Sequence, residues 1–166
     1  MKWRIIISLL FLVLLFACKQ PSNNAVLQNQ VDSLQKALSN TYKPGLGEFM
    51  SGIQVHHAKL WFAGTNKNWE LAAFEINEID EAISDIKTYC SDRPETNSIS
   101  MIEQPIANIT AAIKSKDLTQ FKNSYNVLTS TCNSCHQATN HAFNVIITPT
   151  AVPFTNQNFA NPIEKK

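Results

Sequence analysis

Residues 69–89, with the sequence WELAAFEINEIDEAISDIKTY, carry the clearest structural signal in this chain. The apolar residues recur every three or four positions, which places them on one stripe of an α-helix. That stripe contains Ala72, Ile76, Ile79, Ala82 or Ile83, and Ile86. The opposite face is acidic, and we expect it to be solvated: Glu70, Glu75, Glu78, Glu81 and Asp85. Asn68 precedes the stretch and is a suitable N-cap.

Three further stretches have the same helical spacing. Residues 46–62 gather apolar residues around Ile53, and Gly64 is expected to end this helix. Residues 102–114 form the next helix, which carries Pro105 in its first turn. The last helix starts after Asp117, in a capping-box-like sequence, and runs through Phe121, Tyr125, Leu128 and Cys132 toward His141. Four amphipathic helices with short connections predict an all-α fold, an antiparallel four-helix bundle.

The remaining segments are predicted to be less regular. Residues 91–98 should form a loop, and the tail from about Val145 contains Pro149, Pro153 and Pro162. Apolar residues in the tail suggest that it packs along the bundle: Ile146, Ile147, Val152, Phe154 and Phe159. Aromatic residues at helical spacing are expected in the core: Trp61, Phe62, Trp69, Phe74, Phe121 and Tyr125. Cys90 is interpreted as a small buried residue, and a disulfide between two copies of the chain is the alternative.

Composition narrows the classes of function. The 166 residues include 14 basic and 13 acidic side chains, so a basic nucleic-acid-binding surface is not expected. Charged residues make up only 16% of the chain. Four cysteines are too few for a disulfide scaffold of this length. Their positions are more informative than their number.

The N-terminus predicts export. Lys2 and Arg4 precede an apolar run, residues 5–17, that is too short to span a bilayer but fits a signal peptide. The run ends in Leu15-Phe16-Ala17-Cys18, which resembles the lipobox of bacterial lipoproteins. This resemblance implies cleavage before Cys18 and lipid attachment to Cys18. A plain secretory signal is the alternative.

These features predict three parts: a signal peptide at residues 1–17, a tether at 18–44, and a helical domain with its tail at 45–166. A weak stripe formed by Val31, Leu34 and Leu38 predicts one short helix in the tether. Removal of Lys2 and Arg4 leaves 12 basic and 13 acidic residues. We expect the chain at the cell envelope, held to a membrane through Cys18 and facing the periplasm or the outer surface.

The chemical signal is Cys132-Asn133-Ser134-Cys135-His136. Two cysteines at positions i and i+3, followed at once by a histidine, form the attachment pattern of c-type haem. The two thiols add to the two vinyl groups of the porphyrin, and the spacing sets both sulfurs on one side of a helical turn. The histidine then supplies an axial nitrogen to the iron. The motif predicts one covalently attached haem c.

Other interpretations of the motif have less support. A zinc site needs four ligands, and the chain has no second pair of closely spaced cysteines. A thioredoxin-like dithiol is expected beside a βαβ pattern, which is missing. A structural Cys-x-x-Cys in a lipoprotein without haem is the remaining alternative.

The placement of the motif on the last of four helices resembles the class II c-type cytochromes, the cytochrome c-prime family. The resemblance covers residues 46–143, and the apolar series Phe121, Tyr125, Leu128 and Cys132 is similar to the last helix of that family. About thirty residues follow His136, more than is usual there, and the lipid tether also differs. The resemblance implies that the first helix faces the second side of the iron.

Three residues of the first helix are candidates for that position. On a wheel of 100° per residue, His57 lies about 23° from the centre of the apolar face, Met50 about 43° and His56 about 77°. The resemblance favours Met50 and the wheel favours His57, while His56 is expected at the edge or in solvent. His141 is expected at the surface or beside a haem propionate.

The choice of second ligand separates two functions. An iron ligated by His136 and Met50 indicates an electron carrier, not an enzyme, that serves redox partner proteins of the respiratory chain or envelope. An iron with His136 alone indicates a protein that binds or senses a small gas such as NO or CO. The acidic helix face could steer a basic redox partner. The oligomeric state stays open, with a dimer among the alternatives.

Overall fold

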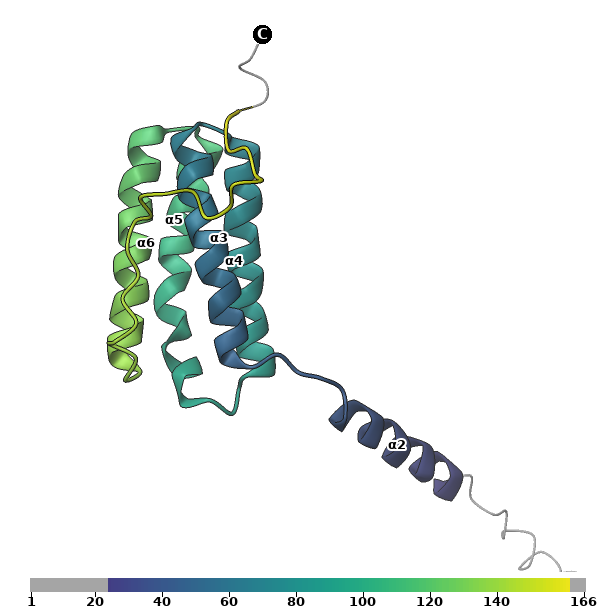
Figure 1. The fold of residues 1–166 in the computed structure, drawn as a ribbon. Helices are drawn as coiled ribbons and strands as arrows, with labels where there is room; N and C mark the ends of the chain where they lie inside the picture. Colours follow the sequence, from purple (N-terminus) through teal and green to yellow (C-terminus); the bar gives the residue numbers. More distant parts are fainter. Residues whose placement is uncertain (1–23, 162–166) are drawn as a thin grey trace, which may run out of the picture. The chain divides into compact units, whose positions relative to one another are not determined.

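A computed structural model of the chain describes residues 24–161, and within this range it contains helices and no strand (Figure 1). The all-α prediction is therefore confirmed. The signal peptide, Cys18 and Pro162 lie outside the described residues. The elements are α2 (Asn24–Ser39), α3 (Leu46–Thr65), α4 (Trp69–Tyr89), the 3₁₀ helix η1 (Pro94–Ile102), α5 (Glu103–Lys114) and α6 (Leu118–Ala138).

The chain divides into two units, and the first ends at Tyr42, two residues before the predicted end of the tether. Its helix, α2, contains the predicted Val31, Leu34 and Leu38 stripe and buries none of its residues. No described helix combines the length and the hydrophobicity that a membrane-crossing segment requires. Because Cys18 lies outside the described residues, its predicted lipid attachment stays a prediction.

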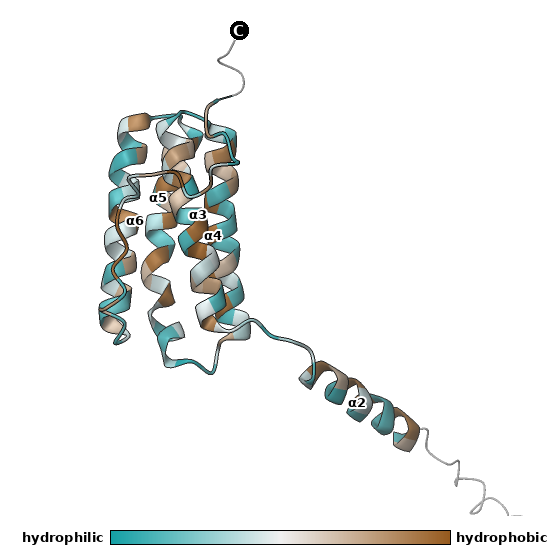
Figure 2. Ribbon diagram, viewed as in Figure 1, coloured by the Kyte–Doolittle hydropathy of each residue, from teal (hydrophilic) through white to brown (hydrophobic). Residues whose placement is uncertain are grey.

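The second unit holds α3 to α6 side by side (Figure 1), and each of these helices packs against two of the others. α3 packs against α4 and α6, and α5 packs against the same two helices. Each helix alternates polar and apolar residues along its length (Figure 2), as the sequence spacing predicts. Isoleucine dominates the core, which includes Ile76, Ile79, Ile86, Ile109 and, from α6, Phe121, Tyr125 and Leu128.

The predicted apolar stripe of α4 is confirmed, but the predicted exposure of two of its side chains is wrong. Ala72, Ile76, Ile79, Ile83 and Ile86 are all buried, and the Asn68 side chain caps the helix by accepting from Leu71 N at 3.2 Å. Glu75, expected in solvent, is completely buried. Phe74, expected in the core, is 52% exposed. Glu75 is buried because α3 presents a histidine and a lysine to it.

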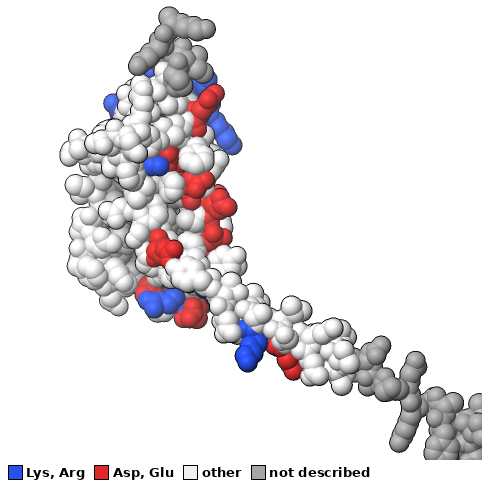
Figure 3. Space-filling model, turned by 45° about the vertical axis from the view of Figure 1, so that its right-hand side comes forward, with Lys and Arg blue, Asp and Glu red and all other residues white. Residues whose placement is uncertain are grey.

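The remaining acids of α4 are exposed or half-buried, as predicted: Glu70, Glu78, Glu81 and Asp85, together with Asp80. Acidic side chains gather along one side of the helical unit (Figure 3).

Gly64 does not end α3, which continues through Thr65. Gly64 is buried, and a methyl group at its Cα would overlap the ring of Phe121 on α6. This glycine therefore permits a close approach of two helices rather than a chain reversal.

The segment between α4 and α5 is more ordered than predicted. Residues 94–102 form η1, which starts at Pro94 and buries Ile99 and Ile102 against the core. Proline suits the first turn because its missing N–H has no helical partner there. At the start of α6, Asp117 accepts from Thr119 N at 2.9 Å and Gln120 N at 3.0 Å, so the predicted cap is confirmed.

The tail leaves the end of α6, runs back along that helix and crosses to α3 (Figure 1). Phe159 is buried against Phe62, with ring centroids 5.7 Å apart, and Asn68 Nδ2 donates to Ala160 O at 3.2 Å. The packing prediction is confirmed for Phe159 and in part for Ile146. It is wrong for Ile147 and Val152, which are 68% and 46% exposed. Phe154 is 40% exposed, and its ring contacts Lys59 of α3.

Candidate functional site

The helical unit contains a cavity of about 390 Å³, a volume within the range of about 300–1,000 Å³ that small-molecule and cofactor sites occupy. Its wall is mainly apolar, with polar side chains from α6, α3 and η1. It brings together every predicted haem-site residue: Met50, His57, Cys132, Cys135 and His136. Helix α3 supplies the first two of these residues, and α6 supplies the last three.

Cys132 and Cys135 lie in the last two turns of α6, where both are half-buried and both are free thiols. Residues three apart share one face of a helix, so both thiols line the same cavity. Burial raises the pKa of Cys132 to about 11, with a smaller contribution from Cys135. Burial also raises the pKa of Cys135. Reactive dithiols have lowered pKa values, so these thiols do not resemble a dithiol redox site.

His136 is held in a defined tautomer. Its Nδ1 lies 2.6 Å from the carbonyl oxygen of Asn144, in the segment after α6. A carbonyl oxygen can only accept, so Nδ1 carries the proton and the lone pair of the neutral ring is on Nε2. Histidines that ligate metals usually donate their second N–H in this way. The side chain is therefore prepared to act as a nitrogen ligand.

His57 lines the same cavity but has both ring nitrogens occupied. Nε2 lies 2.9 Å from Thr129 Oγ1, and Nδ1 lies 2.9 Å from the Tyr125 hydroxyl. The Thr129 hydroxyl donates to the Tyr125 carbonyl at 2.9 Å, so Thr129 Oγ1 accepts from His57 Nε2–H. Nδ1 of the neutral ring is then an acceptor for the Tyr125 hydroxyl, whose oxygen also lies 3.0 Å from the His57 carbonyl oxygen. In this arrangement His57 is a hydrogen-bonded core residue that touches the cavity.

Burial determines the protonation of this network. His57 is only 4% exposed, and desolvation lowers its pKa to about 4, so the ring is neutral at pH 7. Tyr125 is completely buried, and desolvation raises its pKa. No carboxylate contacts either ring among the described residues. The network is therefore uncharged, which suits a site beside an apolar cofactor.

Met50 is the other predicted haem-site residue of α3 that lines the cavity, and it is half-buried. Apolar residues from three helices line the same cavity: Leu46, Ile53, Ile79, Ile83 and Ile102. Met50 and His57 are the two candidate iron ligands that α3 presents to the cavity. Both ring nitrogens of His57 are hydrogen-bonded, whereas the Met50 thioether has no hydrogen-bond partner among the described residues. The helical wheel favoured His57 because it gives only the angle of a side chain around the helix axis and does not detect hydrogen-bond partners.

His56 lies on another side of α3 and does not line the cavity. Its Nδ1 donates to Glu75 Oε2 at 2.6 Å, and Lys59 Nζ is 3.8 Å from Glu75 Oε1. Glu75 Oε1 has no hydrogen-bond partner in the described residues. The His56 side chain is 23% exposed, as expected for a residue at the edge of the helical unit, but its carboxylate partner was missed.

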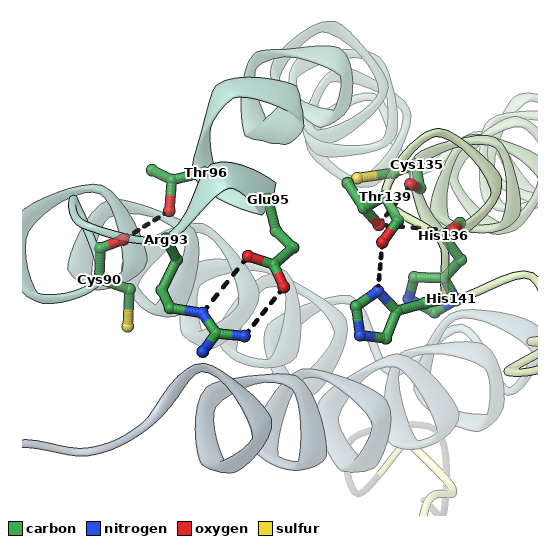
Figure 4. A network of polar contacts seen from close by, with 8 residues as sticks. All are labelled: Cys90, Arg93, Glu95, Thr96, Cys135, His136, Thr139 and His141. Atoms are coloured by element: carbon green, nitrogen blue, oxygen red, sulfur yellow. Dashed lines mark hydrogen bonds and ion pairs between the residues drawn. The ribbon is translucent and has the colours of Figure 1, made fainter.

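Arg93, Glu95 and His141 lie at the cavity wall near the end of α6 (Figure 4). Arg93 donates to the two carboxylate oxygens of Glu95 at 3.3 and 2.9 Å. His141 Nδ1 donates to Thr139 O at 2.7 Å, and the ring is half-buried. Arg93 and Glu95 were missed because the sequence assigns them to a loop with no motif. The Arg93 guanidinium could contact a carboxylate of a porphyrin here.

The donor set fits a haem better than a bare metal ion. No three His, Cys, Asp or Glu side chains gather as a metal site anywhere in residues 24–161. A zinc ion takes four protein ligands, whereas a porphyrin supplies four nitrogens itself and needs only one or two from the chain. A mainly apolar cavity that presents two thiols and one oriented imidazole meets that requirement.

Comparisons of the chain with models of protein families, with curated proteins and with solved structures give no match.

Proposed function

We propose that this protein is a monohaem c-type cytochrome that carries electrons at the cell envelope and is not an enzyme. One observation carries the proposal: Cys132, Cys135 and an Nδ1-protonated His136 line one apolar cavity with Met50. Cys132 and Cys135 would hold the haem covalently, and His136 would ligate its iron. Haem supplies reversible one-electron chemistry when bound. The chain's own residues would bind it, orient the His136 imidazole and exclude water.

The proposal includes a fold type and a location. We propose that α3 to α6 form an antiparallel four-helix bundle of the cytochrome c-prime type, since the motif lies on the last helix. Lipid on Cys18 would hold the protein to a membrane, facing the periplasm or the outer surface. Redox proteins of the envelope or respiratory chain are the proposed partners, and the acidic side of α4 suits a basic one.

Covalent haem attachment is the first expected result. The matured wild-type chain should be red and should keep its haem through acid–acetone extraction, because thioether bonds survive this treatment. A Cys132→Ser/Cys135→Ser variant should lose the haem to the solvent phase. Cys90→Ala is the matched control, since Cys90 is buried outside the cavity, and it should keep its haem. A colourless wild-type chain from cells that mature other c-type cytochromes would contradict the proposal.

The role of Met50 gives a second expected result. We expect the oxidised wild-type spectrum to show a methionine–iron band and the reduced form to bind CO slowly. Met50→Ala should lose the band and bind CO rapidly, because the second axial position is then open. Met101→Ala is the control, since Met101 is 40% exposed and does not line the cavity. Rapid CO binding by the wild type would instead favour a gas-binding protein, which the apolar wall around Met50 would suit.

A further inference from the structure

The chain reverses direction immediately after α6 and returns along it. Asn140 has a φ of 62°, and His141 N donates to His136 O at 2.7 Å. Asn144 N then donates to His141 O at 2.9 Å. Asparagine tolerates this left-handed conformation better than most residues. The reversal brings the Asn144 carbonyl to His136 Nδ1.

One side chain fastens the returning segment to the helix. Asn133 Nδ2 donates to Ile146 O at 2.9 Å, and Ile146 N donates to Asn133 Oδ1 at 2.8 Å. An amide side chain offers one donor group and one acceptor, so it pairs with both backbone groups of one residue. Asn133 stands between the two cysteines of the motif, at a position whose identity haem attachment does not specify.

The two sets of hydrogen bonds are close together in the chain. Asn133 lies three residues before His136, on neighbouring turns of α6, and Ile146 lies two residues after Asn144. The paired bonds to Ile146 therefore restrain the position of the Asn144 carbonyl. Further along the tail, Lys59 Nζ lies 5.4 Å from the ring centroid of Phe154, and Phe159 packs against Phe62.

We propose that Asn133 is a positioning residue for His136. It fixes residues 144–146 against α6, so that the Asn144 carbonyl holds the proton on His136 Nδ1 and keeps the lone pair on Nε2. This inference rests on the proposed function, because it concerns the axial ligand of the haem. A carbonyl acceptor at Nδ1 makes the other ring nitrogen a stronger donor to a metal. We call the paired hydrogen bonds between Asn133 and Ile146 the clamp. A stronger donor favours ferric over ferrous iron, so the clamp should lower the reduction potential.

The test uses the full matured chain and two measurements. Asn133→Ala should accelerate amide hydrogen exchange at Ile146 by about tenfold, the effect expected for the loss of a local hydrogen bond. The same variant should have a higher reduction potential than the wild type. Ser134→Ala is the matched control. Ser134 occupies the other variable position of the motif, and its hydroxyl donates to Ser130 O within α6.

Asn133→Ser is a second, uncharged variant and replaces Asn133→Ala if that variant does not mature. Its single hydroxyl cannot bond both backbone groups of Ile146 as the amide does, so it should also speed amide exchange at Ile146 and raise the reduction potential.

Two results would overturn the inference, and they differ from each other. If Ile146 exchanges faster in Asn133→Ala but the potential equals that of the wild type, the clamp stabilises only the tail and the proposed function is unaffected. If the wild-type chain matures without haem, the proposed function fails and the positioning role fails with it.

Discussion

Gly64→Ala is expected to lower the free energy of unfolding by about 1–3 kcal/mol, the usual cost of overpacking a core. The added methyl group would overlap the ring of Phe121, which is completely buried. That ring cannot move aside easily, because Trp61, Trp69 and Tyr125 surround it at centroid distances of 6.0–6.5 Å. Chemical denaturation of the matured protein measures the change.

Gly52→Ala on the same helix is the matched control. A methyl group at Gly52 meets nothing within 4 Å, so only helix propensity changes, and this should stabilise the protein by about 0.5–1 kcal/mol. The opposite signs of the two substitutions separate overpacking from propensity. The cost of Gly64→Ala should shrink in a Phe121→Leu background, because a smaller side chain vacates part of the space. Equal effects of Gly64→Ala and Gly52→Ala would show that α3 and α6 do not approach this closely.

Acidification from pH 7 to pH 4 is expected to remove about 3 kcal/mol of stability through His57 alone, since one pKa unit corresponds to about 1.4 kcal/mol. Burial lowers the pKa of His57 in the folded chain from its ordinary value of 6.5 to about 4. Between these two values the unfolded chain binds a proton at His57 that the folded chain does not. Stability therefore falls as the pH falls through this window, and the loss due to His57 is complete below about pH 4.

His57→Gln removes the titration and is the test variant. Its unfolding free energy should depend less on pH between 6.5 and 4 than that of the wild type, by about 3 kcal/mol. His141→Gln replaces a half-buried histidine of the same cavity, and it should keep the His57 contribution. If the wild type and His57→Gln have the same slope, His57 is not a buried neutral residue.

The helices could be predicted because their apolar residues recur with a helical period. Residues 69–89 agree with α4 at both ends, since a regular stripe and an N-cap define that segment. Gly64 was misassigned because a glycine suits both a helix end and a close helix contact, and only the partner decides between them. η1 was missed because short 3₁₀ helices have no distinctive period.

The sequence also predicted some residues of the candidate site and missed others. Cys132, Cys135 and His136 were found because their chemistry requires a fixed spacing within one helix turn. Asn144 and Arg93 were missed because they reach the cavity from other segments, and no local pattern marks such residues. Glu75 was placed in solvent because charge normally indicates exposure, yet His56 and Lys59 of α3 make its burial tolerable.

The hydrogen bonds of His57, Tyr125 and Thr129 also determine how α3 and α6 are aligned along their lengths. Apolar stripes alone would tolerate sliding one helix past the other by a turn, about 5.4 Å, because one isoleucine or leucine contact resembles the next. Such a slip would separate His57 from both partners and leave several polar atoms unpaired in the interior, at about 1–3 kcal/mol each. Three hydrogen-bonded polar side chains in an otherwise apolar interface therefore select one helix register among several similar ones.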